Sequence, residues 1–116
     1  MKINEIRPFI PCKDYEQSKS FYKSLGFEGE SAGDDMMIFE KDGCTFFLQN
    51  NFYSEEFSKN LMLQLIVADI EDAYEVVSQI TDGDSKHSEI KQELWGKVVY
   101  LWGPSGELWH ITQLSS

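Results

Sequence analysis

Residues 92–113 read QELWGKVVYLWGPSGELWHITQ, and this stretch decides the fold that we expect for the whole chain. Two apolar runs of strand character, Lys97–Trp102 and Glu107–Gln113, flank the tetrapeptide Gly103-Pro104-Ser105-Gly106. Proline presets one backbone angle and glycine frees another, so the stretch predicts a β-hairpin. It holds all three tryptophans and one of the two histidines. Such a segment forms either the core of a small sheet protein or the wall of a binding pocket.

Composition limits the kinds of protein to consider. A chain of 116 residues, 41% of them hydrophobic, is long enough for one domain with a real core. The net charge of −10 disfavours nucleic acid and anionic membranes as partners, because binding phosphate requires a basic face. The acidity either keeps the protein soluble or concentrates a cationic ligand. No segment resembles a signal peptide or a membrane helix, so we expect a cytoplasmic protein.

The two cysteines, Cys12 and Cys44, both lie in apolar runs of strand character. Their spacing matches no zinc motif, and two cysteines make no disulfide framework. We therefore interpret both as small buried hydrophobic residues.

The first half of the chain predicts one strand, one helix and three further strands. Glu5–Cys12 contains Pro8, which suits an edge strand or a strand exchanged with a partner subunit. Asp14 is placed to cap a helix that closes at Gly26. The expected buried stripe of this helix is Phe21, Tyr22 and Leu25. Strands follow at Phe27–Ser31, Met36–Glu40 and Cys44–Gln49, and then a polar loop at Asn50–Asn60.

The second half repeats this order. Leu61–Val67 predicts a strand, and Asp69, which lies 55 residues after Asp14, caps a second helix that Gly83 ends. The expected inner stripe of this helix is Ile70, Ala73, Tyr74, Val77 and Ile80. His87–Lys91 predicts a weak strand before the hairpin. The chain thus reads as an internal duplication of a βαβββ module.

These elements predict an α+β fold in a single domain over residues 1–116. The first βαβββ module spans 1–50, a loop spans 51–60, and the second module spans 61–116. Each module alone leaves one face of its sheet open. We therefore expect two mixed sheets that curve around a shared concave surface, which places a pocket between the two modules.

This order resembles the vicinal oxygen chelate superfamily, which includes glyoxalase I, extradiol dioxygenases, and fosfomycin- and bleomycin-resistance proteins. The resemblance covers almost the whole chain. Its signatures are Pro8-Phe9-Ile10 before Asp14, Phe21 to Phe27, Val67 to Ile70 with Tyr74, and Trp95-Gly96 followed by Gly103 to His110.

The resemblance also implies where a metal would be held, since enzymes of the superfamily present one histidine or glutamate from each of four strands. The matching positions here are Arg7, Met62, Phe47 or Gln49, and His110. A guanidinium repels a metal, and thioether and phenyl groups do not ligate a hard ion. We therefore expect no metal, no cofactor and no catalytic residue. The alternative is a lyase or dioxygenase with an atypical metal set around His110.

A metal-free member with these signatures looks most like the bleomycin-resistance proteins. That resemblance implies a homodimer that sequesters a bulky cationic glycopeptide antibiotic in grooves between subunits, with the N-terminal strand crossing to the partner near Pro8. The chain departs from the pattern at Gly103, where an acid is common, at Met36, where an aromatic is common, and at Gln64, which replaces a stacking tryptophan. A dimeric module for another metabolite is the remaining alternative.

The ligand-binding residues that we expect combine this resemblance with residue chemistry. Trp95 suits stacking on a planar cation, with a role in the dimer core as its alternative. His110 shares a strand face with Leu108 and Thr112, whereas Trp102 and Trp109 are assigned to packing. His87 is expected in solvent. The full set is Trp95, Asp34, Asp35, Met36, Gln49, Phe52, Tyr53, Gln64 and His110.

Overall fold

The computed structural model describes residues 1–81 and 85–115. Its elements in chain order are β1 (Phe9–Pro11), α1 (Tyr15–Ser24), β2 (Glu28–Ser31), β3 (Met36–Lys41), β4 (Cys44–Gln49), α2 (Glu55–Asn60), β5 (Met62–Ile66), α3 (Ile70–Ser78), β6 (Lys86–His87), β7 (Lys91–Glu93), β8 (Gly96–Trp102) and β9 (Leu108–Leu114). None of these helices is long and apolar enough to cross a membrane.

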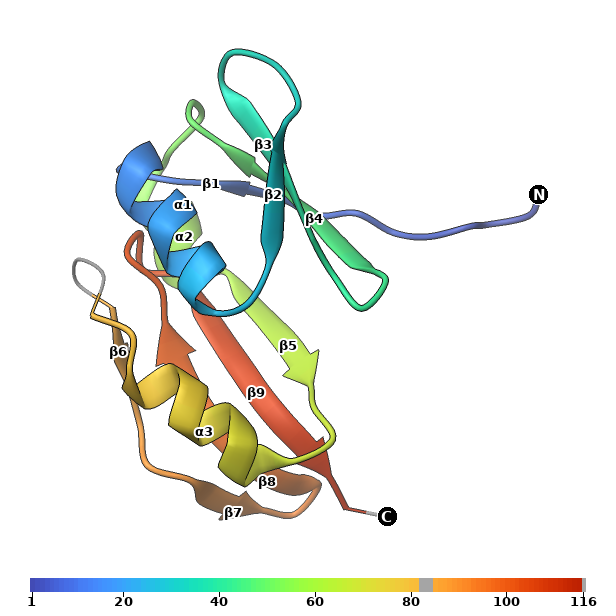
Figure 1. Ribbon diagram of the computed structural model, residues 1–116, viewed down its shortest axis with the longest axis vertical. Helices are drawn as coiled ribbons and strands as arrows, with labels where there is room; N and C mark the ends of the chain where they lie inside the picture. Colours follow the sequence, from blue (N-terminus) through green and yellow to red (C-terminus); the bar gives the residue numbers. More distant parts are fainter. Residues whose placement is uncertain (82–84, 116) are drawn as a thin grey trace.

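The strands form two mixed sheets with the same internal order (Figure 1). The first sheet runs β1-β4-β3-β2, and the second runs β5-β9-β8-β6, with β7 also paired to β8. In each sheet the first strand of the module pairs in parallel with its last strand, and the remaining pairs are antiparallel. The predicted α+β fold of two related modules is confirmed.

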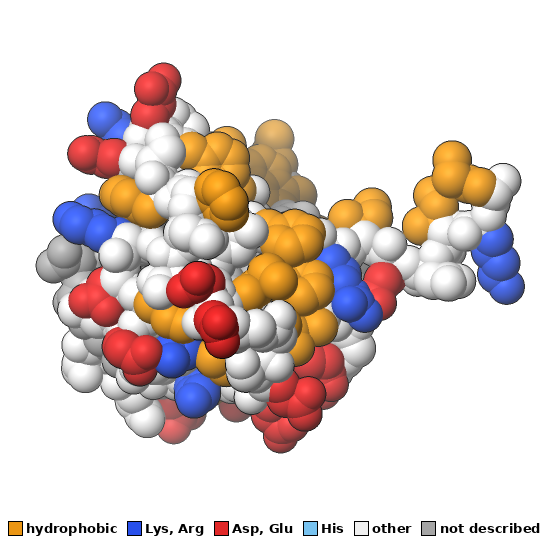
Figure 2. All heavy atoms as spheres, turned by 90° about the horizontal axis from the view of Figure 1, so that it is seen from above, with side chains coloured by type: hydrophobic (Ala, Val, Ile, Leu, Met, Phe, Trp, Pro, Cys, Tyr) orange, Lys and Arg blue, Asp and Glu red, His pale blue; other side chains and the backbone are white. Residues whose placement is uncertain are grey.

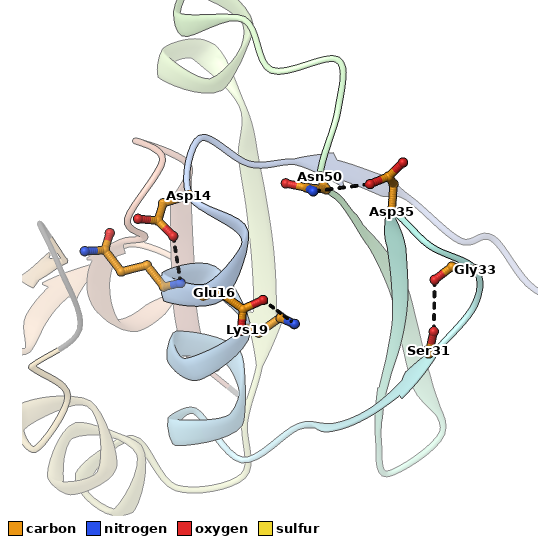
Figure 3. A network of polar contacts seen from close by, with 8 residues as sticks. Asp14, Glu16, Lys19, Ser31, Gly33, Asp35 and Asn50 are labelled. Atoms are coloured by element: carbon orange, nitrogen blue, oxygen red, sulfur yellow. Dashed lines mark hydrogen bonds and ion pairs between the residues drawn. The ribbon is translucent and has the colours of Figure 1, made fainter.

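Helix α1 forms where its capping residue predicts. The carboxylate of Asp14 accepts the backbone N–H of Gln17 at 3.1 Å (Figure 3), which satisfies a free amide of the first turn. Phe21 and Tyr22 are fully buried. The helix ends before Gly26, whose φ of 112° suits a residue without a side chain.

Aromatic contacts around Tyr22 join the two modules into one core. Its ring lies 4.8 Å from that of Phe46 and 5.8 Å from that of Phe39, both in the first sheet. The same ring lies 5.9 Å from that of Trp109 in β9. A single cluster of buried residues therefore extends from the first sheet through α1 to the second sheet.

The hairpin of β8 and β9 supplies both core and surface. Trp109 is buried, as expected for packing, while Trp102 is half-buried and Trp95 is 45% exposed. His110 pairs with Tyr100 across the hairpin, so it lies on the face opposite to Trp109. The three tryptophans thus have three different environments.

Two predictions about strands and cysteines are wrong. The expected strand Glu5–Cys12 is reduced to β1 (Phe9–Pro11). The Pro8 carbonyl still accepts the Phe47 N–H at 2.9 Å, but proline has no N–H to continue the ladder toward residue 5. Cys12 is buried as expected, but Cys44 is exposed, since it begins β4 directly after the turn. Both thiols are free.

Three further predictions need correction in the connecting segments. Asn50–Asn60 contains α2, which begins because the Ser54 side chain accepts the N–H of Phe57. The predicted strand His87–Lys91 is two short strands, β6 and β7, and His87 packs edge-on against Tyr74 instead of lying in solvent. Helix α3 ends at Ser78; the helix-ending role predicted for Gly83 falls outside the described residues.

Candidate functional site

The second sheet has one face on the core and one face turned away from it. Side chains alternate along its strands, so Leu63, Leu65 and Ile111 pack on the core while their neighbours point outward. We call the outward set the His110 face. It consists of Met62, Gln64, Ile66, Val98, Tyr100, Trp102, Leu108, His110 and Thr112.

His110 lies at the centre of this face with its ring nitrogen unpaired. In the register of the sheet it stands between Gln64 on β5 and Tyr100 on β8. The Tyr100 ring meets the imidazole edge-on, with centroids 5.0 Å apart. The Nε2 atom of His110 is buried and has no hydrogen-bond partner among the described residues. A buried polar atom left unpaired costs about 1–3 kcal/mol, so this nitrogen is a ready contact for a bound group.

The amide and the hydroxyl beside His110 are already hydrogen-bonded. The Gln64 side chain donates to the Thr112 hydroxyl at 3.4 Å, and that hydroxyl donates to the backbone carbonyl of His110 at 3.1 Å. Burial raises the pKa of Tyr100, and nearby Glu93 adds to the effect, so its hydroxyl stays protonated. The face therefore offers an aromatic and amide surface around one free imidazole nitrogen.

The first sheet has a similar outward face, which we call the Phe47 face. It includes Phe9, Met36, Ile38, Thr45, Phe47 and Gln49. The rings of Phe9 and Phe47 stack with centroids 4.6 Å apart, and the Arg7 guanidinium lies 5.8 Å from the Phe47 centroid. Phe9 remains 50% exposed.

The positions that would hold a metal do not form a ligand set. Arg7 faces Phe47, and Met62 pairs with Leu108 at the start of β5. His110 is the one imidazole among the matching positions, and the donors beside it are amides, hydroxyls and a phenol. No group of three His, Cys, Asp or Glu side chains able to hold a metal occurs in residues 1–81 and 85–115. These residues do not fit a divalent ion.

Some predicted ligand-binding residues do lie together. Met36 pairs with Gln49 on the Phe47 face, and Gln64 pairs with His110 on the His110 face. Asp35 is exposed in the turn before β3, and its carboxylate accepts the side-chain amide of Asn50 at 3.3 Å (Figure 3). That bond holds Asp35 beside the Met36–Gln49 pair.

The other predicted residues lie at different places on the chain. Trp95 is in the turn between β7 and β8, at the end of the molecule opposite to the β2–β3 loop that carries Asp34 (Figure 1). Phe52 and Tyr53 lie between β4 and α2. Phe52 is 76% exposed with a φ of 66°, a conformation uncommon for a bulky side chain. One chain by itself therefore does not gather all the predicted residues into one groove.

Sequence reasoning overlooked several residues of the two faces. Tyr100 was assigned no contact, although it is the cross-strand neighbour of His110. Met62 is predicted only as a position that matches a metal ligand, and Ile66 only as part of a strand, yet both are exposed, by 65% and 50%. Counting every second residue along β5 from Gln64 places Met62 and Ile66 on the same face as Gln64, and this pattern could have identified them.

A buried polar network supports the His110 face from behind. The Tyr22 hydroxyl donates to the Glu107 carboxylate at 2.8 Å and accepts the Trp109 indole N–H at 3.1 Å. The Ser105 N–H donates to the other carboxylate oxygen at 3.0 Å. Burial raises the pKa of Glu107, and burial together with Glu107 raises the pKa of Tyr22 well above its ordinary value. This network fixes the start of β9 against α1.

Comparisons with known proteins rest on structure. No family profile and no curated protein sequence matches the chain. Solved structures do match over nearly its full length, and they give the chain the fold of the vicinal oxygen chelate superfamily. The predicted resemblance is thereby confirmed at the level of the fold.

Three of these structures show the range of the likeness. A bleomycin-binding protein from Streptomyces verticillus, complexed with copper(II)-bleomycin, has a TM-score of 0.81 at 16% identity, covering 99% of each chain. A bleomycin resistance determinant encoded on transposon Tn5 has a TM-score of 0.80 at 17% identity, covering 98% of this chain and all of that one. The fosfomycin resistance protein FosX from Listeria monocytogenes, complexed with Mn(II) and sulfate, reaches 0.76 at 9% identity, covering 99% and 93%.

Proposed function

We propose that this chain is a non-enzymatic small-molecule-binding protein of the bleomycin-resistance type. It sequesters a bulky cationic ligand, a glycopeptide antibiotic or a molecule of similar chemistry, in a groove between two subunits. The observation that carries the proposal is the buried, unpaired Nε2 of His110 on an outward face lined by aromatic and amide groups. The bleomycin complex of a similar structure supports the class of ligand.

A second copy of the chain is the partner that suits the exposed apolar surface. Phe9, Met62 and Ile66 are at least half exposed on the two outward faces. Ile6 is 85% exposed in the N-terminal arm of residues 1–8, which extends away from the body (Figures 1 and 2). Monomers rarely keep such surfaces in water, so the arm and both faces become buried when two chains exchange arms.

The charge of the chain suits a cationic ligand. A net charge of −10 produces a negative potential that raises the encounter rate with cations. Asp34 and Asp35 are exposed and stand next to the Phe47 face. Trp95, 45% exposed at a hairpin end, offers a flat ring for a heteroaromatic cation. In a dimer these residues from two chains line one groove.

Titration calorimetry with copper-free and copper(II)-bound bleomycin tests the proposal. We expect wild-type protein to bind, and His110→Ala to bind about ten-fold more weakly because one hydrogen bond to the ligand is lost. His87→Ala is the matched control, since His87 packs on Tyr74 outside both faces, and it should change affinity less than about two-fold. Absence of heat with both forms at about 500 µM ligand would exclude bleomycin.

Sedimentation velocity tests the dimer separately. Wild-type chain should sediment as a dimer at about 50 µM, and Met62→Glu should shift it toward the monomer by placing a charge in the apolar interface. Gln17→Glu adds the same charge at an exposed position in the first turn of α1, away from both faces, and should leave the dimer intact. A wild-type monomer at that concentration would contradict the proposed groove.

A further inference from the structure

A cleft of about 370 Å³ opens at the end of the second sheet, where the β8–β9 loop meets α2 and β6. Its volume is within the range of small-molecule sites. It is lined by Lys13, Tyr53, Glu55, Lys59, Lys86, Trp102 and the loop residues Gly103, Pro104, Ser105 and Gly106. Of the residues proposed to contact the cationic ligand, it includes only Tyr53.

The charge of this cleft is opposite to that of the protein. Three of the ten Lys and Arg residues of the chain line it, and Glu55 is its one acid. Within the described residues, Lys13, Lys59 and Lys86 form no ion pair with a carboxylate. A chain with a net charge of −10 that gathers unpaired ammonium groups at one place provides a local site for an anion.

A flat aromatic surface lies beside the ammonium groups. The Lys86 Nζ stands 5.2 Å from the centroid of the Trp102 ring, and Trp102 is half-buried. Tyr53, also half-buried, supplies a second ring to the lining. Aromatic walls of this kind favour planar ligands, because stacking adds to the energy of burial.

The loop also offers a buried hydrogen-bond donor. Ser105 is 6% exposed, and its hydroxyl oxygen accepts the Lys13 backbone N–H at 2.8 Å. No acceptor for the proton of this hydroxyl occurs among the described residues. A buried hydroxyl without an acceptor is stabilised by an oxygen of a bound anion.

We propose that this cleft is a second binding site, which takes a small anion carrying one planar ring system. The anionic group lies among Lys13, Lys59 and Lys86 with the Ser105 hydroxyl, and the ring lies on Trp102. An aromatic carboxylate and a nucleoside monophosphate share this chemistry. The cleft shares Tyr53 with the residues proposed for the cationic ligand and Trp102 with the His110 face. Its three lysines and the Ser105 hydroxyl belong to neither set, so the lysine variants below test the cleft without testing the groove.

Titrations followed by tryptophan fluorescence and by amide chemical shifts test this site. Salicylate and AMP are the two anionic probes, and adenosine and inorganic phosphate carry the ring and the anion separately. We expect at least one anionic probe to shift amides of residues 103–106 and to bind about ten-fold more tightly than adenosine or phosphate. Salicylate binding alone identifies a carboxylate ligand, and AMP binding alone a phosphate ligand.

Charge-matched double variants show whether the cleft itself is responsible. Lys59→Gln with Lys86→Gln should weaken the bound probe about ten-fold or more. Lys91→Gln with Lys97→Gln removes two exposed lysines on β7 and β8 outside the cleft and should weaken it less than about two-fold. Equal losses in the two double variants, or no response to either probe at about 10 mM, would overturn the proposal.

Discussion

Replacing Tyr22 by Phe should destabilise the protein strongly although it removes one oxygen atom. The hydroxyl is fully buried, donates to Glu107 at 2.8 Å and accepts from the Trp109 indole at 3.1 Å. Phe keeps the ring contacts with Phe46 and Phe39. The variant therefore isolates the two hydrogen bonds from the packing.

The expected loss follows from the partners left behind. A hydrogen bond to a charged group contributes about 1.5–3 kcal/mol, and an indole N–H left without an acceptor costs about 1 kcal/mol more. The free energy of unfolding should therefore fall by about 2.5–4 kcal/mol, which lowers the melting temperature of a domain of this size by about 10–15 °C. The Tyr22 hydrogen bond lowers the pKa of Glu107, so the variant also raises this pKa.

The matched control is Tyr74→Phe, measured by circular dichroism and calorimetry at pH 7. The Tyr74 hydroxyl also donates to a carboxylate, that of Glu89, at 2.8 Å, but it does so at the surface. Water replaces this bond, so the melting temperature should change by less than about 2 °C. Equal shifts in the two variants would refute the reasoning that burial makes the Tyr22 network important.

Three further results are expected. Burial raises the pKa of Glu107, so the native state binds the Glu107 proton more tightly than the unfolded state does. Protonation of Glu107 therefore contributes stability that is full below the unfolded pKa and is lost as pH rises through the folded pKa. Glu107→Gln should remove this pH dependence from urea unfolding curves, and the exposed Glu75→Gln should keep it. Maleimide should label the exposed Cys44 in the native protein. It should label the buried Cys12, whose pKa burial raises to about 11, only after unfolding. Equal labelling of the two cysteines in the native protein, measured by peptide mass spectrometry, would contradict this. Gly96→Ala should lower the melting temperature by about 8 °C or more in a thermal melt, because φ is 151° and a Cβ would collide with the backbone of β9, and an unchanged melt would contradict this.

The sequence predicted most of the fold because the fold depends on local signals. Asp14 and Asp69 cap their helices as expected, and the turn at Gly103–Gly106 joins two antiparallel strands as predicted. The errors fall where local signals are weak. Helix α2 has only six residues, and Cys44 is exposed because it is the first residue of β4, paired with Lys41 at the turn end of the hairpin.

The candidate site was less predictable because it depends on contacts between distant strands. Alternation by two placed His110 on one face with Leu108 and Thr112, but its unpaired nitrogen and its contact with Tyr100 require the register of β8 and β9. The cleft beside Trp102 draws lysines from α2, β6 and the segment before α1. No spacing along the chain indicates that these groups meet.

Native mass spectrometry of the full chain with copper(II)-bleomycin tests the central claim most directly. Because the proposed groove is built from two subunits, we predict a dimer that carries two ligand molecules and a monomer that carries none. At about 100 µM ligand, binding to the monomer, or a dimer without ligand, would contradict a bleomycin-type groove between subunits.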